Sequence, residues 1–123
     1  MARLTAVSGL GGKGPACFLL ETRAARLLLD LGYGPQPGLL PNVDSVGKVD
    51  ALLLSHGHRD HAGGLALLDE IGNPSVYATD IVRRMLPAET NSCPLPLHGI
   101  SELLGLRVTT GRSGHAPGGV WLH

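Results

Sequence analysis

The sequence predicts a mixed α/β layered domain, and three observations support this fold class. Short apolar runs fill much of the first third of the chain, which is typical of strands. Later in the chain, strand-like and helix-like segments alternate. Eighteen glycines and nine prolines indicate many tight turns, as expected for short strands and loops rather than long helices. Strands followed by alternating strands and helices favour layers packed around one core.

The first third of the chain predicts three strands and a loop. Residues 3–8 alternate weakly between polar and apolar side chains, while residues 16–22 and 25–31 are apolar runs. Polar residues separate the second and third runs, so we expect these two to form a hairpin. Residues 32–42 contain several glycines and prolines and are predicted to form a loop.

The remaining predicted elements are short. Residues 49–55 form an apolar run of the kind that is buried in a sheet covered on both faces. The pattern then predicts, in chain order, a helix over residues 65–71, a strand over 75–78, a helix over 81–86, a loop over 88–97, and strands over 103–110 and 120–122. Gly72 would end the first helix, and Pro87 the second. Thr79 or Asp80 would cap the second helix at its start.

Composition narrows the class of protein. Ten basic and ten acidic side chains give a formal net charge of zero, so the chain lacks the basic excess that usually marks nucleic-acid binding. One Trp, one Phe and two Tyr leave few aromatic platforms for stacked bases. These features do not exclude a nucleic-acid partner, because the rest of a longer protein could supply the charge.

Cysteine usage and hydropathy predict a cytoplasmic location. Cys17 and Cys93 are too few for a disulfide framework and lack the paired spacing of a zinc ribbon, so we expect both to be reduced. The N-terminus lacks the basic region and apolar block of a signal peptide. No apolar run is long enough to cross a bilayer, which predicts a soluble chain with no membrane partner.

Three histidines and an aspartate follow directly after the apolar run over residues 49–55. His56 and His58 are two residues apart, so their rings lie on the same side of an extended chain and can chelate one ion. Asp60 and His61 come after a bend and can face a second ion. Imidazoles with one carboxylate are typical of zinc, although iron or manganese can also be held. Three of only six histidines fall within six positions, which is improbable by chance, so the cluster predicts a metal site.

A glycine pattern near the N-terminus is explained without a ligand. Gly9, Gly11 and Gly14 match the spacing of the dinucleotide-binding fingerprint. That fingerprint requires a helix to begin after the glycines, whereas Pro15 and a strand-like run follow them here. We therefore interpret the segment as a turn between strands and predict no nucleotide cofactor.

Taken together, these motifs resemble the metallo-β-lactamase superfamily. Residues 56–61, His-Gly-His-Arg-Asp-His, match its HxHxDH signature. Residues 27–32, an apolar run ending in Asp and Gly, are similar to the family's early strand. Residues 114–118, Gly-His-Ala-Pro-Gly, are similar to the segment that carries the next metal-binding histidine. The resemblance covers residues 19–121 and implies an αββα sandwich with one or two metals between its sheets.

The resemblance implies a role for each matching residue. The first metal would be bound by His56, His58 and His115, and the second by Asp60 and His61. Asp30 would support the site from outside by orienting one of the ligands. His98 has no comparable context and is predicted to be structural or exposed.

The family's activity is the hydrolysis of a substrate by a metal-activated water, and we expect one or two zinc ions, or iron or manganese, as cofactor. Asp60 would be catalytic, because it can orient that water or take its proton. Residues 55–64, followed by residues 76–79, most resemble the β-CASP nuclease branch, which implies RNA or DNA as the substrate. A thioester or lactam hydrolase is the alternative within the same family.

The chain departs from the family in its length. The superfamily completes its second metal site with an aspartate and a histidine on later strands, whereas only eight residues follow His115 and none is an aspartate. We therefore expect residues 1–123 to be a single partial domain, the N-terminal half of a longer hydrolase to which the activity belongs. The alternative is a degenerate, non-catalytic metal-binding domain that a partner chain completes. An exposed half-sandwich also predicts a homodimer.

Overall fold

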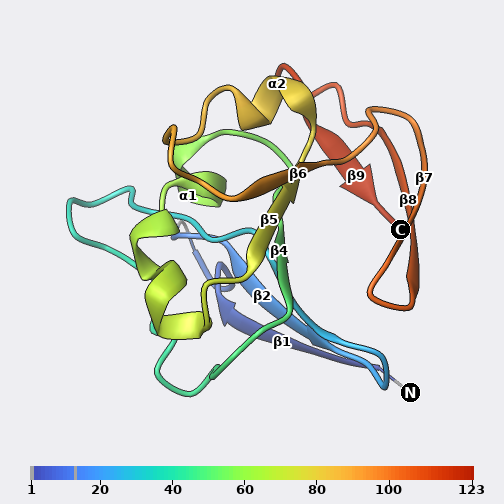
Figure 1. Cartoon of the computed structure of the whole chain (residues 1–123). Coiled ribbons are helices and arrows are strands. Elements are labelled where there is room, and N and C mark those ends of the chain that lie inside the picture. The colour runs from blue at the N-terminus through green and yellow to red at the C-terminus, as the bar shows by residue number, and fades with distance from the viewer. Residues whose placement is uncertain (1, 13) are drawn as a thin grey trace.

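The computed structural model describes residues 2–12 and 14–123, which form two β-sheets and short helices (Figure 1). Within those residues, the first sheet has six strands: β1 (Arg3–Ser8), β2 (Cys17–Glu21), β3 (Arg26–Leu29), β4 (Ala51–Leu53), β5 (Ser75–Ala78) and β6 (Ser92–Pro94). The second sheet has three: β7 (Gly99–Leu103), β8 (Leu106–Arg112) and β9 (Val120–Leu122). The helices are α1 (Arg59–Ala62), the 3₁₀ helix η1 (Leu65–Ile71) and α2 (Asp80–Arg83). The predicted α/β layered fold is confirmed.

The first sheet combines antiparallel and parallel pairing, with its strands in chain order from β1 to β6. β1, β2 and β3 are antiparallel neighbours, which confirms the predicted hairpin between β2 and β3. β3, β4, β5 and β6 are parallel, with Leu29 opposite Leu53 and Leu53 opposite Tyr77. Parallel strands run in the same direction, so the residues that follow β3, β4 and β5 emerge at one edge of the sheet.

β4 lies in the middle of the first sheet and is buried on both faces. Leu52 packs on one face in a cluster with Ile71 of η1 and Val82 of α2. Leu53 packs on the other face in a cluster that includes Val108 of the second sheet. In Figure 1, η1 and the strands β7 to β9 accordingly lie on opposite sides of β4 and β5. Successive side chains of a strand point to opposite faces, so the burial predicted for the run over residues 49–55 is confirmed for β4 and Leu54. The strand is shorter than predicted, and Asp50 is exposed.

Two elements of the second half differ from the prediction. The loop expected over residues 88–97 contains β6, a short edge strand ending in Pro94, and an edge strand tolerates proline because one side of its backbone needs no partner. The single strand expected over residues 103–110 is instead a hairpin of β7 and β8. Leu104 and Gly105 form its turn with φ of 52° and 77°. A leucine rarely adopts positive φ, so this turn could not be predicted from its residue types.

The helices agree with the prediction in position and differ in their details. Residues 65–71 are helical but of the 3₁₀ type, and α2 ends at Arg83, three residues before the predicted end. Thr79 caps α2, since its side chain accepts a hydrogen bond from the backbone N–H of Val82. Between β1 and β2, Gly9 and Gly11 have φ of 99° and 79°, as expected for a turn between strands.

No helix in the described part of the chain is both long and apolar enough to cross a membrane.

The predicted homodimer stays a prediction. Two large apolar side chains of the second sheet, Ile100 and Trp121, are 62% and 47% exposed, so this sheet carries exposed apolar surface.

Candidate metal centre

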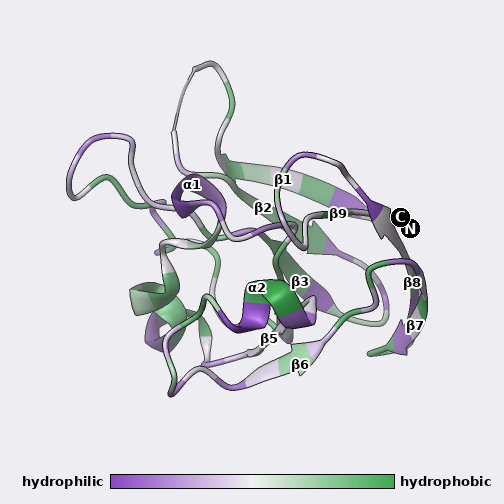
Figure 2. Cartoon of the chain, turned by 90° about the horizontal axis from the view of Figure 1, so that it is seen from above, coloured by the Kyte–Doolittle hydropathy of each residue, from purple (hydrophilic) through white to green (hydrophobic). Residues whose placement is uncertain are grey.

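The histidine motif begins where β4 ends. His56 and His58 follow the strand in extended chain, and His58 is the N-cap of α1 with φ −63° and ψ 147°. Asp60 and His61 lie in α1, which buries none of its side chains and is hydrophilic in Figure 2. The bend that the sequence predicts between the two pairs of residues is therefore made at His58, where extended chain becomes helix.

The motif and one loop of the second sheet bring five side chains together. The centre of the His56 ring lies 4.7 Å from that of His58, 4.1 Å from that of His61 and 4.8 Å from that of His115. His56, His58 and His115 form one set of possible ligands, and His56, Asp60 and His61 form another. In each set the ligand atoms lie within 4.8 Å of one another. The structure thus gathers all five residues predicted as metal ligands, and their role as ligands stays a prediction.

Asp30, at the end of β3, connects the parts of the cluster. It has φ of 61°, a left-handed conformation that aspartate adopts more readily than most residues, and only 9% of it is exposed. Its carboxylate accepts hydrogen bonds from the backbone N–H and the hydroxyl of Ser55, both at 2.7 Å. The same carboxylate lies 2.7 Å from Nδ1 of His61. Asp30 therefore links β3 to the end of β4 and to α1.

These hydrogen bonds determine which nitrogen of each ring is free. An ionised carboxylate only accepts, so Nδ1 of His61 donates to Asp30 and Nε2 of His61 is left for a metal. Ser55 uses its hydroxyl hydrogen on Asp30, so its oxygen accepts from Nδ1 of His56 at 2.9 Å. Nε2 of His56 is then free as well. Asp30 is placed to orient two histidines, one directly and one through Ser55.

Nε2 of His56 is the atom that best tests whether these residues fit a metal. It is buried and has no hydrogen-bond partner among the described residues. Leaving a buried polar atom unpaired costs about 1–3 kcal/mol, a cost that a bound ion removes. Nε2 of His61 and the carboxylate of Asp60 lie 3.7 Å apart in the same cluster. Imidazole nitrogens with a carboxylate oxygen are ligands that zinc and iron accept, so the residues present fit a metal ion.

Burial and neighbouring charges shift the pKa of three groups in or beside the histidine cluster. Burial lowers the pKa of His56, and the nearby His61 lowers it further, which keeps His56 in the neutral form that binds metal. The hydrogen bond to Asp30 raises the pKa of His61, although burial acts in the opposite direction. Burial, with a smaller contribution from the charge of Asp30, raises the pKa of the Cys17 thiol to about 12. Cys17 is therefore a protonated core residue rather than a thiolate ligand.

Gly32 allows α1 to lie directly against the end of β3. A Cβ atom at Gly32 would be 1.8 Å from the carbonyl oxygen of Asp60. The backbone N–H of Ala16 donates to that same oxygen at 2.8 Å, and the N–H of Gly32 donates to the carbonyl of Ala16 at 3.0 Å. The N–H of Leu31 donates to the carbonyl of His61, also at 2.8 Å. Backbone contacts thus fix the half of the motif that follows the bend.

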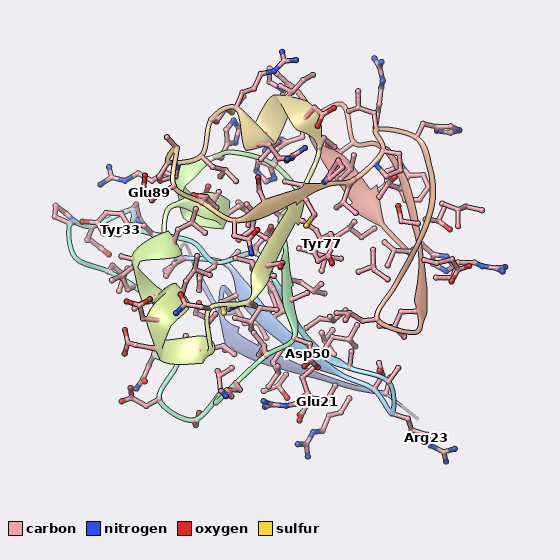
Figure 3. All side chains as sticks on the ribbon, viewed as in Figure 1. Glu21, Arg23, Tyr33, Asp50, Tyr77 and Glu89 are labelled. Carbon is pink, nitrogen blue, oxygen red and sulfur yellow. The ribbon has the colours of Figure 1, made fainter. Side chains whose placement is uncertain are left out.

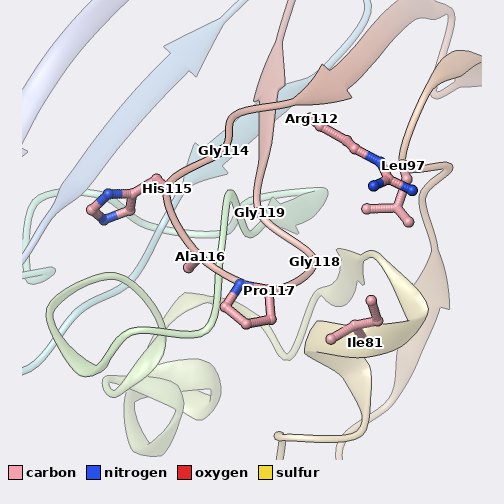
Figure 4. Close-up of a pocket in the computed structure, with 9 residues that line it drawn as sticks. All are labelled: Ile81, Leu97, Arg112, Gly114, His115, Ala116, Pro117, Gly118 and Gly119. Atoms are coloured by element: carbon pink, nitrogen blue, oxygen red, sulfur yellow. The ribbon is translucent and has the colours of Figure 1, made fainter.

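His115 lies in the loop between β8 and β9, with its ring directed outward from the loop (Figure 4). The buried hydroxyl of Thr79 donates to the carbonyl of Gly118 at 2.8 Å. The N–H of Val120 donates to the carbonyl of Ser55 at 2.8 Å. These two bonds attach the loop to the ends of β5 and β4, which brings His115 to the histidine motif.

Sequence reasoning predicted Thr79 as a candidate helix cap, but it missed the hydrogen bonds by which Ser55 and Thr79 help to build the site. Each is a single small polar residue just beyond a strand, and such residues are common there without any function. The available signal was position, because both residues follow parallel strands that end at the same edge as Asp30. His98 is exposed, in agreement with the prediction.

We expect Asp30→Asn to weaken metal binding about 10- to 100-fold, the usual effect of replacing a group that orients a ligand. An asparagine has only one acceptor oxygen and no charge, so it cannot serve Ser55 and His61 in the same way. Competition with a chelating dye measures the affinity, and Asp44→Asn, at an exposed aspartate, is the control. Unchanged affinity in a folded Asp30→Asn variant would show that Asp30 does not orient the ligands.

A match to a family model identifies the family of this chain. Residues 10–122 match the family model described as the Metallo-beta-lactamase superfamily. The chain therefore belongs to the metallo-β-lactamase superfamily, and the resemblance inferred from the HxHxDH motif is confirmed.

The known proteins to which this chain is similar have names that describe different activities. The chain is 34% identical over 92 residues to "Transcription termination factor FttA" of Methanosarcina mazei. This aligned region covers 68% of this chain and 14% of that protein. It is 44% identical over 52 residues to "RNase J-like protein" of Methanocaldococcus jannaschii, covering 42% of this chain and 12% of that protein. The solved structure "Peroxy diiron species of chemotaxis sensor ODP" has a TM-score of 0.73 at 23% identity, covers 98% of this chain and 54% of that one, and shows a similar fold. This chain thus spans only a small part of the two relatives.

Proposed function

We propose that the chain carries the metal-binding part of a metal-dependent hydrolase that cleaves phosphodiester bonds in RNA or DNA. The observation behind this proposal is the buried, unpaired Nε2 of His56, which lies among the other histidine and aspartate donors. Membership of the metallo-β-lactamase superfamily supports metal-dependent hydrolysis. The similarity to an RNase J-like protein supports a phosphodiester as the bond that is cleaved.

The residues of the cluster have different proposed roles in binding metal and activating water. His56, His58 and His115 would hold one ion, and Asp60 and His61 would hold a second, with zinc as the proposed metal and iron as the alternative. A divalent ion bound there would lower the pKa of its water to about 7 and polarise a phosphoryl oxygen. The side chain of Asp60 is 54% exposed, so its carboxylate can orient a water at the surface or accept its proton. His58 and His115 are also exposed, which leaves the cluster open to a polymer.

Hydrolysis of a short single-stranded RNA by the purified chain is the test of this proposal. We expect cleavage that stops when a chelator removes the metal and returns when zinc is added back. Absence of cleavage by metal-loaded chain, even at equal amounts of protein and RNA, would contradict the proposed hydrolase. Cleavage of a lactam or a thioester without cleavage of RNA would contradict the proposed substrate.

A non-catalytic metal-binding domain is the second candidate. What supports it is one solved structure of similar fold, whose name describes a chemotaxis sensor with a diiron species. In this case the cluster would hold iron and a partner chain would complete the site. Stoichiometric iron in the purified chain, together with no cleavage of any ester or amide substrate, would favour this candidate.

A further inference from the structure

A groove of about 630 Å³ lies beside the metal centre. Its lining includes Asp60 and His61, and it also includes Phe18, Tyr33 and Arg59. Arg59 is the residue between His58 and Asp60 in the motif, and neither metal binding nor proton transfer requires it. The groove thus places an arginine and two of the chain's few aromatic side chains next to two expected metal ligands.

Arg59 and Tyr33 form a stacked pair held by several contacts. The guanidinium carbon of Arg59 lies 4.3 Å from the centre of the Tyr33 ring. The backbone N–H of Tyr33 donates to the carbonyl of Arg59 at 2.9 Å, and the Tyr33 hydroxyl accepts from the N–H of Gly38. A Cβ atom at Gly63 would be 2.5 Å from the carbonyl oxygen of Arg59 and 2.9 Å from both Cγ of Arg59 and Cβ of Tyr33, so the glycine leaves room for the pair. The guanidinium is therefore positioned before any substrate arrives, which reduces the entropic cost of binding.

The charge of Arg59 is available for a ligand. Arg59 is exposed, and within the described part of the chain it takes part in no ion pair and no side-chain hydrogen bond. Ion pairs with carboxylates instead occupy Arg3, Arg26, Arg83 and Arg107. A guanidinium that stacks on a ring keeps its N–H edge free, and this edge matches the oxygens of a phosphate.

We infer that the Arg59–Tyr33 pair is a phosphate-binding subsite for single-stranded nucleic acid, and that it holds a phosphate next to the one at the metal cluster. The inference rests on the proposed function and specifies how the strand is positioned. With zero formal net charge, the chain has no overall attraction for a polyanion, so affinity depends on single cations at the site. Phe18 and Tyr33 add ring surface for the unstacked bases of a single strand, which a duplex cannot offer.

Binding of a fluorescent, phosphorothioate-linked oligothymidylate tests the inference, because this probe resists cleavage by the metal-loaded chain. We expect Arg59→Ala to weaken binding about tenfold at low salt and to reduce the slope of log K against log salt by about 0.7, the value for one phosphate contact on a single strand. Tyr33→Leu removes the stacking surface without changing any of the expected metal ligands, and we expect it to weaken binding about threefold or more.

Arg23→Ala is the matched control, since it removes the same charge from an exposed residue in the turn between β2 and β3. Figure 3 shows Arg23 and Tyr33 far apart on the molecule. We expect binding by this variant to stay within about twofold of the wild type, with the same salt slope. The metal content of every variant is measured beside binding, and if Arg59→Ala loses metal, Tyr33→Leu decides the outcome.

The results separate the subsite from the proposed function. If the wild type cleaves RNA and the Arg59 and Tyr33 variants bind the probe as the wild type does, the subsite is wrong and the hydrolase stands. An effect of Arg23→Ala equal to that of Arg59→Ala would also overturn the subsite, because it would indicate general electrostatic attraction. If metal-loaded wild type binds no probe, both the subsite and the nucleic-acid substrate are wrong, while the metal centre remains.

Discussion

Replacing His58 with alanine is expected to lower the affinity for the first metal ion by more than about 100-fold, a larger effect than the loss of a group that only orients a ligand. The variant leaves His56 and His115 as the remaining members of that set. Two imidazoles do not complete the tetrahedral coordination that zinc prefers. Metal content per purified chain measures the result, and cleavage of RNA should be lost with the metal.

His98→Ala is the matched control, because it removes another exposed histidine that is in neither ligand set. We expect this variant to keep the metal content of the wild type. If His58→Ala and the wild type hold equal amounts of metal, the cluster is not the binding site. This outcome would contradict the proposed metal-dependent hydrolase.

Gly32→Ala is expected to destabilise the chain by about 3 kcal/mol or more, or to prevent folding, because the new methyl group overlaps backbone rather than a movable side chain. The added carbon would lie 1.8 Å from the carbonyl oxygen of Asp60 and 2.9 Å from the backbone nitrogen of Ala16. Relief of this overlap requires α1 to move away from the end of β3. Urea unfolding followed by circular dichroism measures the change in free energy.

Gly12→Ala provides the comparison for Gly32→Ala. A Cβ atom at Gly12 would have no atom of the described residues within 4 Å, so the same chemical change meets open space. We expect its midpoint of unfolding to stay near that of the wild type. Equal stability of the Gly32→Ala and Gly12→Ala variants would mean that α1 does not lie as close to β3 as the structure places it.

The sequence predicts elements well where their pattern is local. Residues 3–8 and 75–78 form strands with the predicted bounds, and the order of strands and helices follows from the same patterns. β6 consists of Ser-Cys-Pro at an edge of the sheet, so it lacks the apolar run that marks the central strand β4. The hairpin of β7 and β8 depends on a leucine at positive φ, for which propensities give no warning.

The site likewise contains features that the local sequence predicts and features that depend on tertiary structure. His56, His58, Asp60 and His61 form one short motif, so the sequence alone predicts their proximity, and the superfamily resemblance adds Asp30 and His115. The hydrogen-bonded path from Asp30 through Ser55 to His56 depends on the register between β3 and β4. The Arg59–Tyr33 pair likewise depends on a backbone contact between distant segments. Such contacts follow from tertiary structure and leave no periodic signal in the chain.

The parallel pairing of β3 with β4 has a kinetic consequence. Antiparallel β1, β2 and β3 follow one another through short connections, whereas β3 and β4 can pair only after residues 30–50 have closed into a loop. Asp30 reaches Ser55 only at that step, and His115 arrives only after the second sheet has docked. We therefore expect the ligand geometry to be completed late in folding. A bound ion should then slow unfolding strongly and leave the rate of folding nearly unchanged, so that metal extends the lifetime of the folded chain without helping it to form.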